Sequence, residues 1–118
     1  VHSCGAEGNF YGLIGARLAG VPIRVGEEIG IPSHSEMAKK VFRLIYKSAS
    51  GMIAVAKSVG DYLLKNKEVR PDKLSIIYNP VDVEKFDKPN KTSDDVFIIL
   101  AVCRLHSIKN LKTLLGAF

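Results

Sequence analysis

The sequence predicts an α/β fold in which helices flank a Rossmann-like parallel sheet. Short apolar runs alternate along the chain with segments whose apolar residues recur at helical spacing. Such alternation is typical of βαβ units, and the longest apolar run, residues 96–102, suits a strand buried on both faces. With 118 residues, 47% of them apolar, the chain can form one compact unit but not two complete domains.

The first half of the chain predicts two helices, the first of which leads into a short strand. The first helix follows a glycine-bearing turn and ends before Gly20 and Pro22, and residues 23–25 predict the strand. Ser33 with Glu36 three residues later matches a capping box, so a second helix begins there. The first helix has apolar residues at helical spacing: Phe10, Leu13, Ile14 and Leu18. The second has one predicted apolar face: Met37, Val41, Leu44 and Ile45.

The second half continues the same alternation. Residues 51–56 predict a buried strand, and Ser58 with Asp61 repeats the capping-box spacing at the start of a third helix. Residues 74–78 predict a short strand that ends before Pro80, because proline lacks a backbone donor and disfavours helix in the residue before it.

The composition changes after this strand, which predicts a domain boundary. Residues 79–95 are rich in Asp, Lys, Pro and Asn, as in a surface connection. We therefore assign residues 1–78 to the later part of one Rossmann-like domain and residues 79–95 to an interdomain linker. Residues 96–118 would be the first strand and helix of a second domain. Both ends interrupt a pattern, so we expect an internal fragment.

Charge and cysteine usage only partly limit the possible binding partners and the cellular compartment. The net charge of +5 is spread along the chain, which fits anionic small molecules or an anionic membrane surface as well as nucleic acid. Cys4 and Cys103 have neither the spacing of a zinc site nor that of a redox site, so a reducing cytosol is expected. The predicted second helix has one basic face. Such a face is most often solvated, but beside apolar residues it could rest on anionic lipid. Its residues are Lys39, Lys40, Arg43 and Lys47.

Two cations lie where a predicted strand ends and a predicted helix begins. Arg104 follows the apolar run 96–102, and Lys109 comes five residues later. Ligands of open α/β sheets bind at the carboxyl ends of strands, and a helix N-terminus offers unpaired N–H groups. Arg104 and Lys109 could therefore neutralise a pyrophosphate. The alternative is a pair of solvated loop cations, which spacing alone favours.

Several segments together resemble family 4 glycosyltransferases of the GT-B fold. Residues 100–110 resemble the V-G-R-L-x-x-x-K-G/N element that opens the second domain, and residues 79–86 resemble the interdomain element N-G/P-V-D-x-x-x-F. Residues 1–4 resemble V-H-x-H, residues 16–22 resemble a-r-l-x-g-v-P, and residues 51–64 resemble the strand and helix before the interdomain element. The segments follow the order of the family and cover nearly the whole chain.

The resemblance implies a retaining glycosyltransferase of the hexosyltransferase type, inactive as this fragment alone. It would transfer a sugar from a nucleotide diphosphate sugar to a polysaccharide, lipopolysaccharide or lipid-linked acceptor, without a metal or a further cofactor. Arg104 and Lys109 would contact the donor diphosphate and stabilise charge on the departing phosphate. Two positions depart from the pattern: Cys103 stands where glycine is common, and Cys4 stands where a second histidine is frequent.

The acceptor side has weaker candidates. Glu27 and Glu28 follow a predicted strand and would face the edge at which ligands bind, and His2 lies in the turn that resembles V-H-x-H. The alternative for the acidic pair is a polar surface loop. His34 and His106 could act as acid or base, but lone loop histidines are usually solvated. No catalytic base is identified.

A second class of function stays open on the sequence alone. The chain could be a non-catalytic α/β module that binds a phosphorylated ligand or a partner protein through its basic face. An acidic E-x7-E element and a complete second half in the intact gene would separate the enzyme from this module. For the enzyme we expect a cytoplasmic location, with peripheral contact at the inner face of the cell membrane as an option, and no nucleic acid partner.

Overall fold

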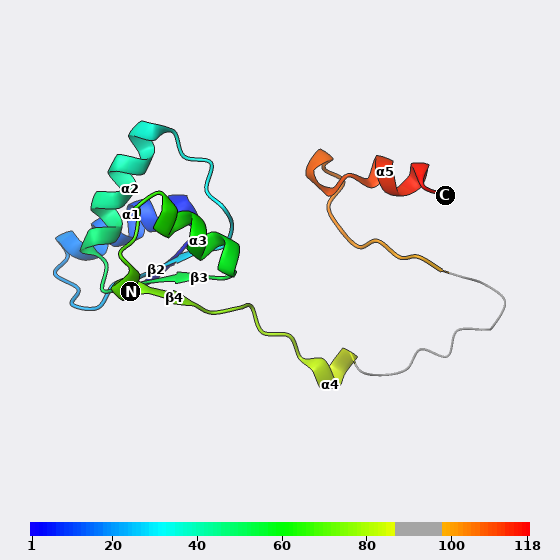
Figure 1. Cartoon of the computed structure of the whole chain (residues 1–118). Helices are drawn as coiled ribbons and strands as arrows, with labels where there is room; N and C mark the ends of the chain where they lie inside the picture. Colours follow the sequence, from blue (N-terminus) through cyan, green and yellow to red (C-terminus); the bar gives the residue numbers. More distant parts are fainter. Residues whose placement is uncertain (87–97) are drawn as a thin grey trace. The chain divides into compact units, whose positions relative to one another are not determined.

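The chain divides into two compact units, Val1–Val81 and Asp82–Phe118. The structure, a computed structural model, describes residues 1–86 and 98–118 (Figure 1). Much of the predicted linker and the start of the predicted strand at residues 96–102 lie outside the described residues.

The first unit is built on a parallel sheet of four strands. Their order in the sheet is β1-β2-β3-β4, which is also their order in the chain. The strands are β1 (His2–Cys4), β2 (Val25–Glu28), β3 (Gly51–Ala54) and β4 (Leu74–Ile76). The sheet confirms the predicted α/β class.

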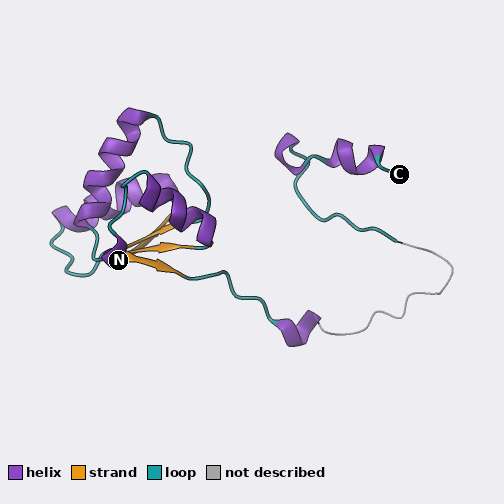
Figure 2. Cartoon of the chain, in the orientation of Figure 1, coloured by secondary structure: helices purple, strands orange, loops and turns teal. Residues whose placement is uncertain are grey.

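Each pair of neighbouring strands is joined by one helix, and the three helices lie on one side of the sheet (Figures 1 and 2). Right-handed crossovers between successive neighbouring strands place the helices on the same face. A short 3-10 turn, η1 (Pro71–Lys73), leads into β4. The helices are α1 (Gly5–Leu18), α2 (Glu36–Ser48) and α3 (Lys57–Lys65).

The core lies between this helical layer and the sheet. Strand residues alternate in burial, and the side chains of Met52 and Ala54 face the helices. At Gly26 the packing leaves no room for a side chain, because an added Cβ would lie 2.7 Å from the Met52 sulfur. The largest buried apolar side chains come from all three helices and β3: Leu13, Phe42, Ile45, Tyr46, Met52 and Leu63.

The buried face of α2 differs from the predicted one. Ile45 is buried as expected, but its buried neighbours are Phe42 and Tyr46, while Met37 and Leu44 are 77% and 71% exposed. The helix has apolar residues on two sides, so the aliphatic spacing alone did not identify the core side. The aromatic side chains of Phe42 and Tyr46 have larger surfaces, so their removal from water stabilises the fold more.

Both predicted capping boxes are also wrong. Helix α2 begins one residue after Ser35, whose Oγ accepts a hydrogen bond from the Ala38 backbone nitrogen at 3.3 Å, so Ser33 is not the cap. Helix α3 follows Ala56 and has no side-chain cap, although Ser58 lies two residues further on. The strand expected at residues 23–25 instead begins at Val25 and runs to Glu28.

The second unit contains short helical segments: α4 (Val83–Phe86), η2 (Ser107–Lys109) and α5 (Leu111–Gly116). Helix α5 confirms the helical pattern at the end of the chain. Residues 98–102 do not form the expected buried strand, and their apolar side chains are exposed, with Leu100 81% and Val102 88% accessible. A strand is stabilised by its neighbours, and the described part of this unit contains no other strand that could pair with it.

Candidate functional site at the carboxyl edge of the sheet

The carboxyl ends of the four parallel strands lie at one edge of the sheet, where open α/β sheets bind ligands. Strands β1 and β2 end there at Cys4 and Glu28, and Cys4 is paired in register with Glu27. Of the predicted acceptor-side residues, His2 comes from β1 and Glu27 and Glu28 come from the end of β2. The structure thus brings two segments together that are more than twenty residues apart.

The side chains of His2 and Glu27 contact each other across the two neighbouring strands. His2 Nε2 lies 2.8 Å from Glu27 Oε2, and the side chains are 55% and 18% exposed. The register explains the contact, because His2 pairs with Val25 and therefore shares a sheet face with the residue two positions further along β2. This pair presents an imidazole and a carboxylate together at the sheet surface.

Glu28 points to the other face and lies in the protein interior, where it is only 2% exposed. Its Oε1 accepts hydrogen bonds from the Tyr46 hydroxyl at 2.5 Å and from Asn9 Nδ2 at 2.9 Å. Burial, together with the Glu28 carboxyl group, raises the pKa of the Tyr46 phenol far above its usual range. Tyr46 therefore stays protonated and donates, so Glu28 joins β2 to two helices rather than facing solvent.

Asn9 connects the ends of β1 and β2 through its side-chain amide, and no sequence pattern marked it as a site residue. Its amide oxygen accepts from Ser3 Oγ at 2.8 Å and from the Glu27 backbone nitrogen at 3.3 Å. Its amide nitrogen also donates to the Glu27 carbonyl at 2.9 Å. The available signal was its position four residues before the buried Leu13, because a polar residue in an apolar helical stripe indicates a buried hydrogen-bond network.

Cys4 is an exposed thiol at the end of β1. Partial desolvation and the carboxylates of Glu27 and Glu28 raise the pKa of this thiol above its ordinary value of 9.0. The thiolate is the nucleophilic and metal-binding form, so these surroundings disfavour both roles at neutral pH. Cys4 therefore acts as a small neutral side chain beside the acidic residues.

His34 lies inside the molecule, not in a solvated loop. Its ring stacks on Phe42 with a centroid separation of 4.1 Å, and its Nδ1 lies 3.2 Å from Glu68 Oε2. Burial raises the pKa of the Glu68 carboxyl above its ordinary value of 4.5, against the lowering effect of His34. Since the side chains of His34 and Glu68 are 8% and 0% exposed, the pair anchors the segment after β2 to the segment after α3.

The predicted donor-side cations belong to the second unit. Arg104 is exposed in the loop before η2, and Lys109 is the exposed last residue of η2. His106 caps this turn, because its Nδ1 accepts from the Ile108 backbone nitrogen at 3.3 Å. Both cations therefore flank the short turn that precedes α5, and neither side chain is buried.

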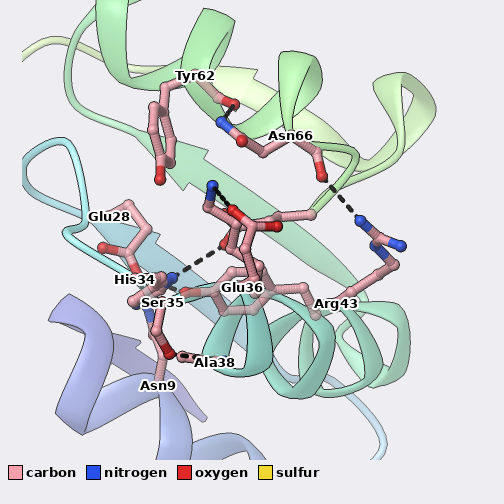
Figure 3. Close-up of polar contacts among 12 residues, drawn as sticks. Asn9, Glu28, His34, Ser35, Glu36, Ala38, Arg43, Tyr62 and Asn66 are labelled. Carbon is pink, nitrogen blue, oxygen red and sulfur yellow. Dashed lines mark hydrogen bonds and ion pairs between the residues drawn. The ribbon is translucent and has the colours of Figure 1, made fainter.

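The predicted basic face of α2 is only partly a free surface. Lys39 is half-buried, and its ammonium contacts Glu36 Oε1 at 2.7 Å. Arg43 donates through Nη2 to the Asn66 carbonyl at 3.0 Å (Figure 3). Lys40 and Lys47 are exposed on the same side of the helix as Leu44.

Within residues 1–86 and 98–118, no group of three or more metal-ligating side chains gathers in one place. Among the helices of this same part of the chain, none combines the length and apolar character needed to cross a membrane.

Comparisons with known proteins agree on one family. The family model described as Glycosyltransferase Family 4 matches residues 1–85, which include the sheet, its helices and the His2–Glu27 pair. The putative glycosyltransferase EpsF of Bacillus subtilis (strain 168) is 29% identical over 114 residues, an alignment that covers 82% of this chain and 30% of EpsF.

A second relative carries a more specific description. The UDP-Gal:alpha-D-GlcNAc-diphosphoundecaprenol alpha-1,3-galactosyltransferase of Escherichia coli is 34% identical over 94 residues, which covers 73% of this chain and 24% of that protein. The chain thus spans 24–30% of the length of these curated relatives. No solved structure matches it.

Proposed function

We propose, from the premise that this chain belongs to glycosyltransferase family 4, that the intact protein is a retaining hexosyltransferase of the GT-B type. Its donor would be a nucleotide diphosphate sugar, and its acceptor a lipid-linked saccharide from which a polysaccharide or lipopolysaccharide is made. The family match over residues 1–85 carries this proposal. The acceptor class rests on the diphosphoundecaprenol-linked acceptor in the name of the galactosyltransferase relative.

On the donor side we assign the diphosphate to Arg104 and Lys109. Both are exposed around η2, where nothing in the described residues neutralises their charge. A guanidinium offers a planar fork of donors to a phosphate, and an ammonium acts as a point charge. Their contribution to the rate grows as negative charge develops on the departing diphosphate, so they would stabilise the transition state more than the bound donor. No metal or further cofactor is needed for this role.

On the acceptor side we assign the edge formed by β1 and β2. The His2–Glu27 pair is accessible there, and its imidazole and carboxylate can hydrogen-bond to sugar hydroxyls. Glu28 contributes indirectly, because its bonds to Asn9 and Tyr46 fix the end of β2 against α1 and α2. This arrangement supports acceptor binding by a rigid strand edge.

A lipid-linked acceptor would suit a cytoplasmic enzyme that contacts the inner face of the membrane. The exposed side of α2 carries apolar Met37, Val41 and Leu44 beside the cationic Lys40 and Lys47. Apolar residues flanked by cations are typical of helices that lie on anionic lipid surfaces. We therefore place the membrane contact on this side of α2 rather than on Lys39, which is engaged with Glu36.

The phosphate assignment is tested by donor kinetics of the intact protein with UDP-, GDP- and ADP-sugars and a lipid-linked saccharide acceptor. Arg104→Ala and Lys109→Ala should each lower kcat/KM about tenfold or more, because a charge-assisted contact is worth about 1.5–3 kcal/mol. Lys112→Ala, which removes an exposed cation of α5, is the matched control and should leave kcat/KM unchanged. Unaltered kinetics in both variants would refute the donor role, and no transfer from any donor by the wild type would favour the non-catalytic module.

A further inference from the structure

A basic hollow lies on the first unit at the edge opposite the candidate site. It is formed between the C-terminal half of α2 and the segment that leads from α3 into β4. Lys47 precedes β3 and Lys73 directly precedes β4, so the hollow is at the amino ends of these strands. Five cations line it: Arg43, Lys47, Lys67, Arg70 and Lys73.

Backbone contacts hold two of these cations in fixed positions. Lys73 Nζ donates to the Lys47 carbonyl at 2.9 Å and to the Ala49 carbonyl at 2.5 Å, and both carbonyls are at the end of α2. The C-terminus of a helix carries partial negative charge, and Lys73 cancels it beside the hollow. Arg43 is held by the Asn66 carbonyl, so it is fixed without being neutralised by an acid.

The acidic residues nearby balance only one of these five charges. Arg70 pairs with Asp72 outside the hollow. The other acid, Glu68, lines the hollow but its side chain is 0% exposed and turns inward to His34. Among the described residues, Lys47, Lys67 and Arg43 have no carboxylate within ion-pair distance. Like charges at one hollow destabilise the folded chain, and the contacts described above leave the charges of Arg43, Lys47 and Lys67 without a compensating acid.

We infer that this hollow binds a phosphate group, a second anion site remote from the carboxyl edge and separate from the proposed transfer reaction. Arg43 supplies a guanidinium and Lys47 and Lys67 supply ammonium groups, which are the donors that recognise phosphate oxygens. Arg70, whose fork is bonded to Asp72, and Lys73, whose ammonium is bonded to two carbonyls, also line the hollow. Tyr46 also lines the hollow, but its hydroxyl donates to Glu28 and is therefore committed to the interior. The phosphate can belong to a soluble polyphosphate or to a lipid headgroup.

Two substitutions remove charge from the hollow with little effect on packing. Lys67→Asn suits the backbone, because Lys67 has a φ of 54° and asparagine tolerates that left-handed conformation. Arg70→Gln removes an exposed guanidinium, and neither residue lies on α2, so the proposed membrane contact is left intact. Lys57→Gln with Lys65→Gln is the matched control, since it removes two exposed cations of α3 outside the hollow.

Binding is measured on the intact protein by titration calorimetry with sodium tripolyphosphate, and by flotation with phosphatidylglycerol vesicles and with neutral phosphatidylcholine vesicles. The K67N/R70Q protein should bind tripolyphosphate, the phosphatidylglycerol vesicles or both at least about tenfold more weakly. The Lys57/Lys65 control should bind as the wild type does. An Arg104→Ala/Lys109→Ala protein should retain this binding, which separates the hollow from the proposed donor site. Thermal unfolding verifies that each variant is folded.

The probe that responds identifies the source of the phosphate. Loss of tripolyphosphate binding indicates a soluble ligand, and loss of binding to phosphatidylglycerol vesicles alone indicates a lipid headgroup. The inference is overturned if the wild type binds neither probe, or if K67N/R70Q binds both as tightly as the wild type. It is also overturned if the Lys57/Lys65 control loses as much binding, because the attraction would then come from diffuse net charge.

Discussion

At the residue scale, the most consequential group is the buried carboxyl of Glu28. Asn9 and Tyr46 both donate to the same oxygen of this carboxyl, and the three residues come from β2, α1 and α2. A buried polar group is costly unless it is hydrogen-bonded, so each donor supports the position of the other two residues. The edge that carries His2 and Glu27 therefore depends on residues that do not reach its surface.

Tyr46→Phe should destabilise the first unit by about 1–3 kcal/mol, because it removes one donor from a buried carboxyl and leaves the aromatic packing in place. Urea denaturation followed by circular dichroism measures the free energy of unfolding. Tyr11→Phe is the control, since Tyr11 is 69% exposed and its hydroxyl can be replaced by water. Equal stabilities of the wild type and Tyr46→Phe would contradict a structural role for the hydroxyl.

Glu68→Gln should change how stability depends on pH. The pKa of Glu68 is raised by burial, so the native state binds more protons than the unfolded state at pH values above the ordinary 4.5. The contribution of Glu68 to the free energy of unfolding is therefore fully present below pH 4.5, and it is lost as the pH rises through the raised pKa. Glutamine can still accept from His34 but cannot ionise.

The measurement is the difference in free energy of unfolding between Glu68→Gln and the wild type, from acid to neutral pH. It should shift in favour of the variant as the pH rises above 4.5. Glu84→Gln, at an exposed position in α4, shows the effect of losing one carboxyl at the surface. A constant difference for Glu68→Gln across this range would mean that its native pKa is not raised.

At the scale of elements, the helices show how much of the fold could be predicted from the sequence. Apolar spacing located α1, α2 and α3 and their order between the strands, because helical periodicity survives whatever the helices pack against. It could not select the buried side of α2, where Met37 and Leu44 are as apolar as Ile45 but face outward. That choice depends on the sheet and on α1, which are contributed by other parts of the chain.

The candidate site was predictable to a similar extent. The alternation of strands and helices placed His2 and Glu27 near one sheet edge, but only the register between β1 and β2 brings them within 2.8 Å. Glu28 was equally acidic in the sequence, and strand alternation alone turned it to the opposite face. Asn9, Tyr46 and Glu68 carried no motif, since Asn9 and Tyr46 bond to Glu28 over 19 and 18 residues and Glu68 contacts His34 over 34 residues.

The cap of α2 gives a test at this scale. Ser35→Ala should cost about 1 kcal/mol of stability, because the Ala38 backbone nitrogen loses its side-chain acceptor. Ser33→Ala is the matched control, two residues earlier in the same exposed segment, and should leave the melting temperature nearly unchanged. A larger effect at Ser33 than at Ser35 would restore the capping box predicted from the sequence.

At the scale of the whole molecule, the stability of the described chain is concentrated in its first unit. Every member of the buried apolar cluster lies between Leu13 and Val69. Within residues 98–118 no side chain is buried. The first unit therefore has its own core, while the described part of the second unit has the cations of the proposed donor site.

A chain that ends at Val81 should therefore unfold with the same melting temperature as the 118-residue chain. Differential scanning calorimetry of the two chains measures this, and the longer chain should show no additional cooperative transition. A lower melting temperature of the shorter chain would show that residues 82–118 contribute to the core. The comparison also tests the boundary proposed near residue 79 from composition.

The matching order of the strands in the sheet and in the chain bears on how the protein assembles. Each strand from β2 to β4 pairs with the strand that precedes it in the sequence, so no pairing spans an intervening strand of this sheet. Each pairing needs only one helix and its loops between the two strands, as a parallel crossover requires. The pairing of β1 with β2 therefore requires residues only up to Glu28, which are synthesised well before residues 98–118.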